Sequence, residues 1–422
     1  MERKEDLVHE LKRVKVIIGN GFDLYCGLKT SYYDFFKFCD QKYNSIFGWV
    51  DDMANIYHSN PNLKKDIRLL YHSVPGADRI SCWDVFFTLF MDRVRNYLWC
   101  DVEKEILDSL YLRDEGRAQE YMPHWEDVWE VVECNTVKDQ GPGSAIMASV
   151  ILNVASLPLR TREQFYEYLL SELHKFEICF GYFITKQHVI RGDLHYQFNL
   201  DYITSSQHLL SRLCNEEDIT SIDCFNYGFT TQSKLFNKCK FINGDCRNPI
   251  FGVDSIFGPD DPRYIFTKTN RRIEQDMGET TTKDYPEFEN AVVFGHSLNS
   301  HDYSYFFPIL DQLEMTNNFS KRKFVIAYSI YDRNRVFEIT KNIRKSLYSL
   351  FSAYSRYKGN TNEPARLLDS LTTQGRVLMY QIDPITKPEH PFIEREDLVE
   401  AESMEEIIDL RWREYMEYGA KY

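Results

Sequence analysis

The run Val14-Lys15-Val16-Ile17-Ile18 is rich in β-branched residues and ends abruptly in the glycine loop Gly19-Asn20-Gly21-Phe22-Asp23. A run of this kind, bounded by glycine, is typical of a strand buried on both faces of a parallel sheet. After the loop, Thr30-Ser31-Tyr32-Tyr33-Asp34 has the Ser-x-x-Asp form of a helix capping box. The opening therefore predicts a strand, a glycine loop and two successive helical segments.

Strand-like runs return in the second half of the chain, separated by segments of helical character. They are Ser221–Phe225, Lys240–Ile242, Ala291–Phe294, Phe324–Tyr328 and Arg376–Tyr380. Strands that alternate with helices predict a doubly wound α/β fold, a Rossmann-type parallel sheet. Ligands bind such sheets beyond the carboxyl ends of the strands. Three runs end directly in glycine or polar motifs, namely Val14–Ile18, Ser221–Phe225 and Ala291–Phe294. We therefore expect these motifs to share one site.

The 422 residues exceed the size at which one hydrophobic core stops growing, roughly 250–300 residues. We expect a discontinuous nucleotide-binding α/β domain made of residues 1–45 and 203–385. Between them, residues 46–202 carry apolar positions at helical spacing and predict a mainly helical insertion. Residues 386–422 are expected to form a helical C-terminal extension.

The composition excludes several classes of protein. A hydrophobic fraction of 43% rules out a disordered chain, and a net charge of −14 argues against a broad grip on nucleic acid. The basic stretch from Arg333 to Lys345 is better explained as a solvated helix face than as a nucleic-acid groove. Ten dispersed cysteines show no zinc-type spacing. With no signal region and no run of about 20 apolar residues, we expect a cytoplasmic protein without a membrane span or a metal site.

The loop Gly19-Asn20-Gly21 can bring backbone amides close to a phosphate, because glycine tolerates φ > 0 and has no side chain to clash. A simple tight turn explains the same residues. On the phosphate interpretation, Gly21→Val should abolish nucleotide binding in a folded protein. Asp23 would repel a phosphate, so a ribose hydroxyl or a water is its expected partner, and capping of the helix N-terminus is the alternative.

Two later loops carry further polar groups. Asn226 follows the second strand and can hold a ribose or a carboxamide, although an Asx turn is a common use of asparagine there. His296 and Ser297 follow Gly295 after a third strand, where histidine can titrate near neutral pH or be purely structural. Asp302 lies six residues beyond His296 and could orient it.

These motifs together resemble the AbiH family of bacterial abortive-infection proteins. The resemblance rests on Val16–Leu24, Gly27–Tyr32, Phe225–Tyr227, Phe294–Leu298, Asp302 and Tyr305–Phe306. It implies a protein of phage defence.

AbiH-like proteins in turn resemble the sirtuin-like nucleotide-binding fold, which implies NAD or a related nucleotide as ligand. On that mapping Gly19-Asn20-Gly21 would hold the pyrophosphate, Asn226 would approach the nicotinamide ribose, and Gly295 and Ser297 would line the adenosine side. The resemblance thus implies a set of ligand-binding residues: Gly19, Asn20, Gly21, Phe22, Thr30, Tyr227, Asn243, Gly295, Ser297 and Asp302.

One departure bears on chemistry. AbiH-like proteins tend to carry His-Gly where this chain has Asn243-Gly244, and asparagine cannot act as a base at neutral pH. If the protein is an enzyme, we expect a glycohydrolase that cleaves the N-glycosidic bond of NAD, with Asn226, His296 and Asp23 as catalytic residues. The alternative is a non-enzymatic sensor or scaffold that binds a nucleotide or a phage protein, or self-associates, and acts through a partner. A nuclease, the third possibility, lacks a recognisable acidic metal cluster.

Overall fold

The computed structural model describes residues 10–42, 81–90, 102–111, 161–191, 196–228, 234–254, 256–276, 286–330, 333–360 and 365–382. The chain divides into two compact units. The first comprises Met1–Thr30, Ile184–Asp245 and Gly278–Met404, and the second comprises Ser31–Phe183, Cys246–Met277 and Glu405–Tyr422. The predicted domain boundaries stay predictions, and the expected helical extension over residues 386–422 lies outside the described residues.

The first unit contains a six-stranded sheet in the order β5-β4-β1-β6-β7-β8, in which every neighbouring pair is parallel. The strands are β1 (Val14–Ile18), β4 (Ile219–Cys224), β5 (Cys239–Phe241), β6 (Asn290–Phe294), β7 (Lys323–Ser329) and β8 (Val377–Ile382). All six predicted strands are present, so the predicted parallel α/β sheet is confirmed. Counted along the chain, the order is 3-2-1-4-5-6, that of doubly wound dinucleotide-binding sheets.

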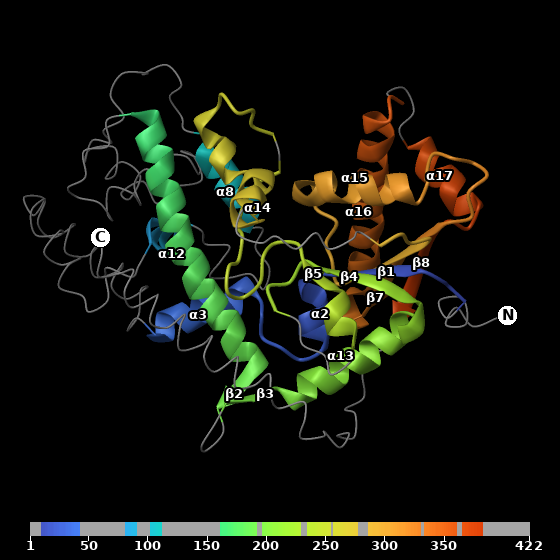
Figure 1. The fold of residues 1–422 in the computed structure, drawn as a ribbon, viewed down its shortest axis with the longest axis horizontal. Helices are drawn as coiled ribbons and strands as arrows, with labels where there is room; N and C mark the ends of the chain where they lie inside the picture. Colours follow the sequence, from blue (N-terminus) through green and yellow to red (C-terminus); the bar gives the residue numbers. More distant parts are fainter. Residues whose placement is uncertain are drawn as a thin grey trace, which may run out of the picture. The chain divides into compact units, whose positions relative to one another are not determined.

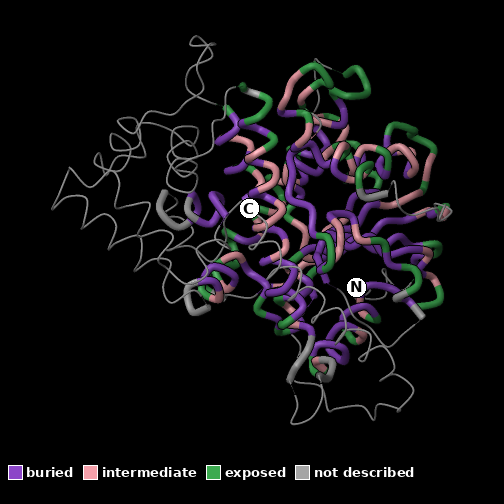
Figure 2. The backbone as a smooth tube through the Cα atoms, turned by 60° about the vertical axis from the view of Figure 1, so that its left-hand side comes forward, coloured by how far each residue is buried: buried purple, intermediate pink, exposed green. Residues whose placement is uncertain are grey.

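Helices cover both faces of this sheet (Figure 1). Val14, Val16 and Ile18 pack with residues of α2 (Asn20–Tyr25) and α13 (Leu200–Leu213) on one face. On the other face, Ile17 packs with residues of α15 (Tyr303–Gln312), α16 (Val336–Tyr357) and α17 (Arg366–Thr373). Because alternate residues of β1 face opposite layers, all five are buried, which explains why the strand is β-branched at every position except Lys15 (Figure 2).

The regular structure of the second unit is mainly helical in its described residues. It contains α3 (Tyr32–Lys42), α6 (Cys82–Phe90), α8 (Val102–Leu110), most of α12 (Arg162–His188) and α14 (Lys268–Asp276). The predicted capping box is confirmed, since the backbone N–H of Asp34 donates to Ser31 Oγ at 3.2 Å. The core of the second unit is aromatic, with ring contacts among Phe35, Phe176 and Phe180. The carboxylate of Glu177, nearly fully buried, accepts two hydrogen bonds from the Arg271 guanidinium.

Short elements complete the description. They are the antiparallel pair β2 (Val189–Arg191) and β3 (Tyr196–Phe198), and the 3₁₀ turns η3 (Glu216–Asp218), η4 (Lys234–Lys238), η5 (Pro262–Phe266), η6 (Ser300–Asp302) and η7 (Arg333–Arg335). Of the helices that the structure describes, none combines the length and the apolar character needed to cross a membrane.

Candidate functional site

The three polar loops singled out in the sequence meet at one edge of the sheet. Ile18, the last residue of β1, pairs with Cys224 of β4 on one side and with Phe294 of β6 on the other. Cys224 pairs in turn with Phe241, the last residue of β5. The residues that follow these four strands therefore lie side by side, and we call this region the carboxyl edge. It includes the point where the strand order reverses, between β1 and β6.

The glycines bring two of these loops into backbone contact. Gly19 N–H donates to Phe294 O at 3.0 Å, and Gly21 N–H donates to Gly295 O at 2.9 Å. A Cβ added to Gly21 would lie 2.7 Å from Gly295 Cα, and one added to Gly295 would lie 2.3 Å from Phe22 N. The backbone amides of the first loop were expected to approach a phosphate closely, but here they approach the backbone carbonyls of Phe294 and Gly295.

The conformation expected of the first loop needs correction. Gly19 has φ −122°, Gly21 is not among the residues with positive φ, and Gly295 is the glycine that adopts φ 70°. Of Gly19, Gly21 and Gly295, only Gly295 thus uses the left-handed region that glycine tolerates. Gly21→Val is consequently expected to separate the two loops and destabilise the first unit, because valine would collide with backbone atoms.

Three other predicted ligand-binding residues of this loop have partners within the protein. Thr30 Oγ1 donates to Asn20 Oδ1 at 2.7 Å, and Asn20 Nδ2 donates to Thr30 O at 3.3 Å. Phe22 is fully buried and meets Phe294 edge to face, with ring centroids 6.2 Å apart. Asn20 and Thr30 tie the start of α2 to the segment that precedes α3, while Phe22 anchors α2 to the sheet.

Asp23 lies in the interior of the first unit. Its side chain is 1% exposed, and its Oδ1 accepts a hydrogen bond from the Tyr202 hydroxyl at 2.7 Å. Burial raises the pKa of Asp23 to about 7, against the opposing effects of the Tyr202 hydrogen bond and of the nearby Asn226 amide. Asp23 is therefore a carboxyl group that exchanges its proton near neutral pH, as general acids and bases do.

Asn226 and Asn243 place buried amide groups at the same edge. Asn226 is 3% exposed and Asn243 is 7% exposed. Within the described parts of the chain, neither Nδ2 nor Oδ1 of Asn226 makes a hydrogen bond of acceptable geometry, although its amide lies close enough to Asp23 to lower the pKa of that carboxyl. Asn243 Oδ1 also lacks a hydrogen bond to any described residue. Buried polar atoms of this kind are rare in folded proteins, and a bound group can satisfy them.

His296 has contacts at both ring nitrogens. Its Nδ1 accepts from the Leu298 backbone N–H at 2.9 Å, and its Nε2 lies 3.3 Å from Asp302 Oδ2. The Nε2–H tautomer satisfies both contacts. Asp302 thus occupies the orienting position suggested by the sequence, while Ser297 between them is exposed.

The predicted catalytic residues divide between the two faces of the sheet. Asp23 meets Tyr202 of α13, whereas the His296 ring packs against Phe225 and Phe306, at centroid distances of 4.3 and 5.1 Å. Phe306 belongs to the core of the α15 face. Asp23 with Asn226 and His296 with Asp302 therefore form two separate polar groups at one edge. Of the other predicted residues, Tyr227 is buried next to Asn226 in the chain.

Two buried polar arrangements escaped the sequence analysis. Tyr202, the partner of Asp23, sits in an amphipathic helix where it is indistinguishable from a core residue. On the opposite face of the sheet, Lys15 Nζ lies 2.6 Å from Asp223 Oδ2, with both side chains at most 2% exposed, and the Tyr305 hydroxyl donates to the same oxygen. Charged residues inside two apolar strands were the available signal for this pair.

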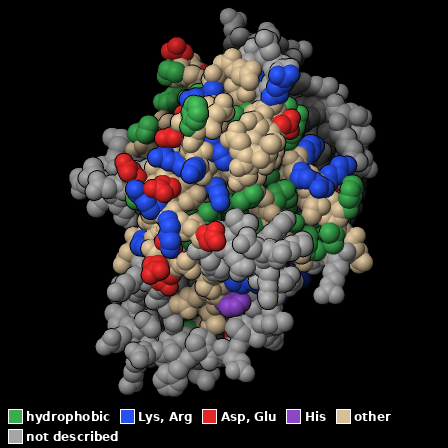
Figure 3. Space-filling view, turned by 90° about the vertical axis from the view of Figure 1, so that its right-hand side faces the viewer, with side chains coloured by type: hydrophobic (Ala, Val, Ile, Leu, Met, Phe, Trp, Pro, Cys, Tyr) green, Lys and Arg blue, Asp and Glu red, His purple; other side chains and the backbone are tan. Residues whose placement is uncertain are grey.

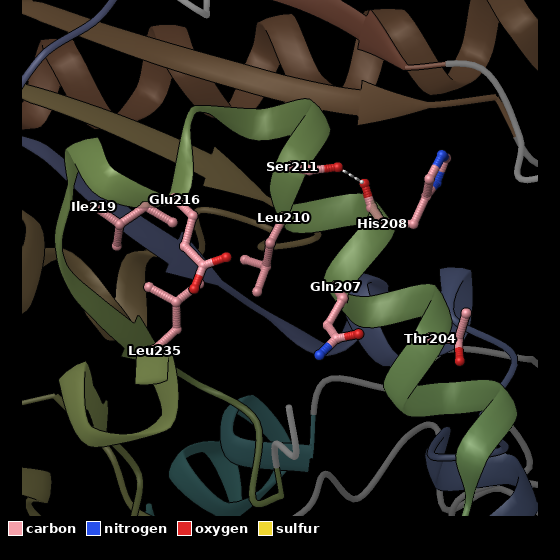
Figure 4. A pocket seen from close by; sticks show the side chains of 8 residues that line it. All are labelled: Thr204, Gln207, His208, Leu210, Ser211, Glu216, Ile219 and Leu235. Atoms are coloured by element: carbon pink, nitrogen blue, oxygen red, sulfur yellow. Dashed lines mark hydrogen bonds between the residues drawn. The ribbon is translucent and has the colours of Figure 1, made fainter. Parts of the chain in front are cut away.

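One hollow of the first unit lies away from these groups. It has a volume of about 470 Å³ and is bordered by α13, η3 and the start of β4, with Leu210, Glu216 and Ile219 in its lining (Figure 4). Ile219 is the first residue of β4, so the hollow is at the amino ends of the strands. It therefore does not include the carboxyl edge.

Two broader features concern possible partners. On the face drawn in Figure 3, Lys and Arg side chains are interspersed with acidic and apolar ones rather than gathered in one field. Among the described residues, no group of three or more His, Cys, Asp or Glu side chains is arranged to hold a metal ion.

Comparison with known proteins adds one relationship. The model of the family described as bacteriophage abortive infection AbiH matches residues 16–175, which include most of β1, the glycine loop, α2 and α3. Neither the curated proteins nor the solved structures contain a match. Over these residues the chain is similar to the bacteriophage abortive infection family AbiH.

Proposed function

We propose that the chain acts in phage abortive infection by binding NAD or a related nucleotide at the carboxyl edge and hydrolysing its N-glycosidic bond. The family match supports the defence role. The 3-2-1-4-5-6 strand order supports the ligand class, because sheets of this order bind dinucleotides where the order reverses.

The observation that carries the proposal is the buried amide of Asn226. Among the described residues, neither its oxygen nor its nitrogen has a hydrogen-bond partner, and the side chain is 3% exposed, one residue beyond Phe225, which follows β4. An amide offers one acceptor and two donors, so it matches a ribose diol or a carboxamide. Asn243 Oδ1 after β5 adds a second acceptor. Leaving these atoms unpaired costs stability that a nucleotide with hydroxyl and amide groups would recover on binding.

Asp23 is our first choice for the proton acceptor. In hydrolysis a water oxygen bonds to C1′ of the ribose, the bond from C1′ to the nicotinamide nitrogen breaks, and nicotinamide leaves with the bonding pair. The attacking water must lose a proton, and a carboxylate with a pKa of about 7 can accept it at neutral pH. Tyr202 donates to Oδ1 of Asp23, so we assign Oδ2 as the oxygen that accepts the proton.

His296 is the second candidate for that proton. Its Nε2 would have to give up Asp302, and its Nδ1 would have to give up the Leu298 N–H. We therefore assign His296 primarily to holding the 295–298 loop in place beside the glycine loop.

The second candidate function is a sensor that binds a nucleotide without cleaving it. Asn243 stands where related proteins tend to carry histidine, and asparagine cannot accept a proton at neutral pH.

Nicotinamide release from NAD, measured alongside NAD binding, separates the two functions. We expect Asn226→Ala to abolish turnover, and Asp23→Asn to reduce it by about 10²–10⁴-fold, the usual effect of losing a general base. His296→Ala should reduce it less. Asp311→Asn is the matched control, because Asp311 also accepts from a tyrosine, Tyr354, but on the α15–α16 side of the unit. Binding without turnover in the wild type would favour the sensor, and absence of binding would refute both.

A further inference from the structure

Tyr202 and Asp23 form a buried pair that joins α13 to α2. The hydroxyl-to-carboxylate distance is 2.7 Å, and each side chain is 1% exposed. The Tyr202 ring is held in turn by the His188 ring, which meets it edge to face with centroids 4.8 Å apart. Because both side chains are enclosed, the orientation of the Asp23 carboxyl depends directly on the position of the tyrosine hydroxyl.

The groups that face Asp23 from the packed elements are neutral. Cys26, which follows α2, and Cys224 of β4 are buried thiols whose pKa values burial raises well above their usual range. Tyr202 of α13 likewise has a pKa well above its usual range, mainly through burial, and burial lowers the pKa of His188 to about 4. Asn226 carries no charge. No cation among the described residues is thus seen to compensate a charge on Asp23, in contrast to Asp223, which pairs with Lys15 at 2.6 Å.

We propose that Tyr202 is the positioning residue for Asp23 and that a ribose-bearing ligand binds at the carboxyl edge with release of one proton from the Asp23 carboxyl. This inference rests on the proposed nucleotide site, and it adds a residue and a form of regulation that the site motifs do not contain. It makes nucleotide binding sensitive to pH around neutrality.

Hydrogen-bond balance gives the direction of the coupling. A protonated carboxyl offers one donor and must direct it at an acceptor, whereas a carboxylate accepts only. Ribose hydroxyls are donors, and a hydrogen bond donated to a charged carboxylate is stronger than one to a neutral acid. Binding therefore favours the carboxylate, and the displaced proton passes to solvent. Tyr202 donates to the same carboxyl and stabilises the charged form in the free protein as well.

The first measurement is the dissociation constant of ADP-ribose from about pH 5 to about pH 9. We expect affinity to rise about tenfold per pH unit up to a midpoint near the Asp23 pKa of about 7, and to level off above it. Asp23→Asn should remove the dependence. Tyr202→Phe should shift the midpoint upward by about one pH unit, since it removes a hydrogen bond to the charged form while keeping the ring against His188. Calorimetry in buffers of different ionisation enthalpy should show one proton released per ligand below the midpoint.

Tyr354→Phe is the control, because it removes a tyrosine hydroxyl from a different carboxylate, that of Asp311, and should leave the midpoint unchanged. Affinity that does not vary with pH, in a wild type that binds, would overturn the coupling while leaving the nucleotide site intact. Absence of binding at every pH would overturn both.

A second measurement needs no ligand. The Asp23 carboxyl of the free protein, followed by carbon-detected NMR, should titrate near neutral pH and later in Tyr202→Phe. A midpoint below about 5 in the wild type would refute the inference independently of nucleotide binding.

Discussion

Gly295→Ala tests whether the contact between the two glycine loops organises the carboxyl edge. Gly295 has φ 70°, and its new Cβ would lie 2.3 Å from Phe22 N and 2.6 Å from Gly21 C. Gly375→Ala provides the matched control, since Gly375 has φ 67° and no atom within 4 Å of the added Cβ. Both substitutions put alanine in the left-handed region, but only the first also forces backbone atoms apart.

The expected magnitudes follow from these two situations. The left-handed conformation costs an L-residue about 1–2 kcal/mol, which should be the whole effect at Gly375. At Gly295 the loops must also separate and strain or break the 2.9 Å bond from Gly21 N–H to Gly295 O. A buried amide left unpaired costs about 1–3 kcal/mol, so we expect a total loss of about 2–5 kcal/mol.

The assay must report on the first unit. The six tryptophans all fall in the sequence ranges of the second unit, so their fluorescence would follow the wrong part of the chain. Urea unfolding should instead be followed by far-UV circular dichroism together with hydrogen exchange of peptides from β1 and β6. Equal losses for Gly295→Ala and Gly375→Ala would show that the loop contact contributes nothing beyond the strained φ.

Three further changes test other parts of the structure. Lys15→Met should destabilise the first unit by about 3–5 kcal/mol in urea unfolding, because it leaves a buried carboxylate without its cation. The control Lys12→Met removes a surface ion pair and should change the stability little. Similar losses for the two variants would refute the buried-pair argument. The pKa of Asp23 is raised from about 4 in the unfolded chain to about 7 in the folded protein. Its contribution to the free energy of unfolding is therefore present below pH 4 and is lost as the pH rises to 7. In unfolding measurements across this pH range, Asp23→Asn should flatten that fall in stability. Ser31→Ala should lower the stability by about 1 kcal/mol through loss of the α3 cap, while Ser297→Ala, at an exposed position, should be neutral. If both variants are neutral in a thermal-shift comparison, the cap does not contribute to stability.

The α/β sheet was readable from the sequence because each strand is short, buried and bounded. β1 and β6 are buried at every position, so their apolar runs stand out against the polar loops that follow them. Parallel strands expose the same end to the same edge, so the meeting of the glycine loop, Asn226 and Gly295 followed from strand order alone.

What the loops do at that edge depended on tertiary structure. The sequence predicted that Gly19 and Gly21 would approach a phosphate, but their amides are bound to the carbonyls of Phe294 and Gly295, some 275 residues away in the chain. The positive φ belongs to Gly295 rather than to the first loop. Local sequence reports that a close approach is needed, and only the folded chain decides which backbone makes it.

The same limit applies to charge. A carboxylate in the first turn of a helix is typical of a residue that stabilises the helix N-terminus. The sequence by itself established only that Asp23 follows a buried strand and a glycine loop. Its burial and its bond to Tyr202, 179 positions along the chain, were decided by the packing of α13 against α2. Ionisation responds to the dielectric environment and to hydrogen-bond partners, and both come from residues distant in sequence. The sequence thus determined which groups reach the carboxyl edge, whereas tertiary packing decided which of them can exchange a proton at neutral pH.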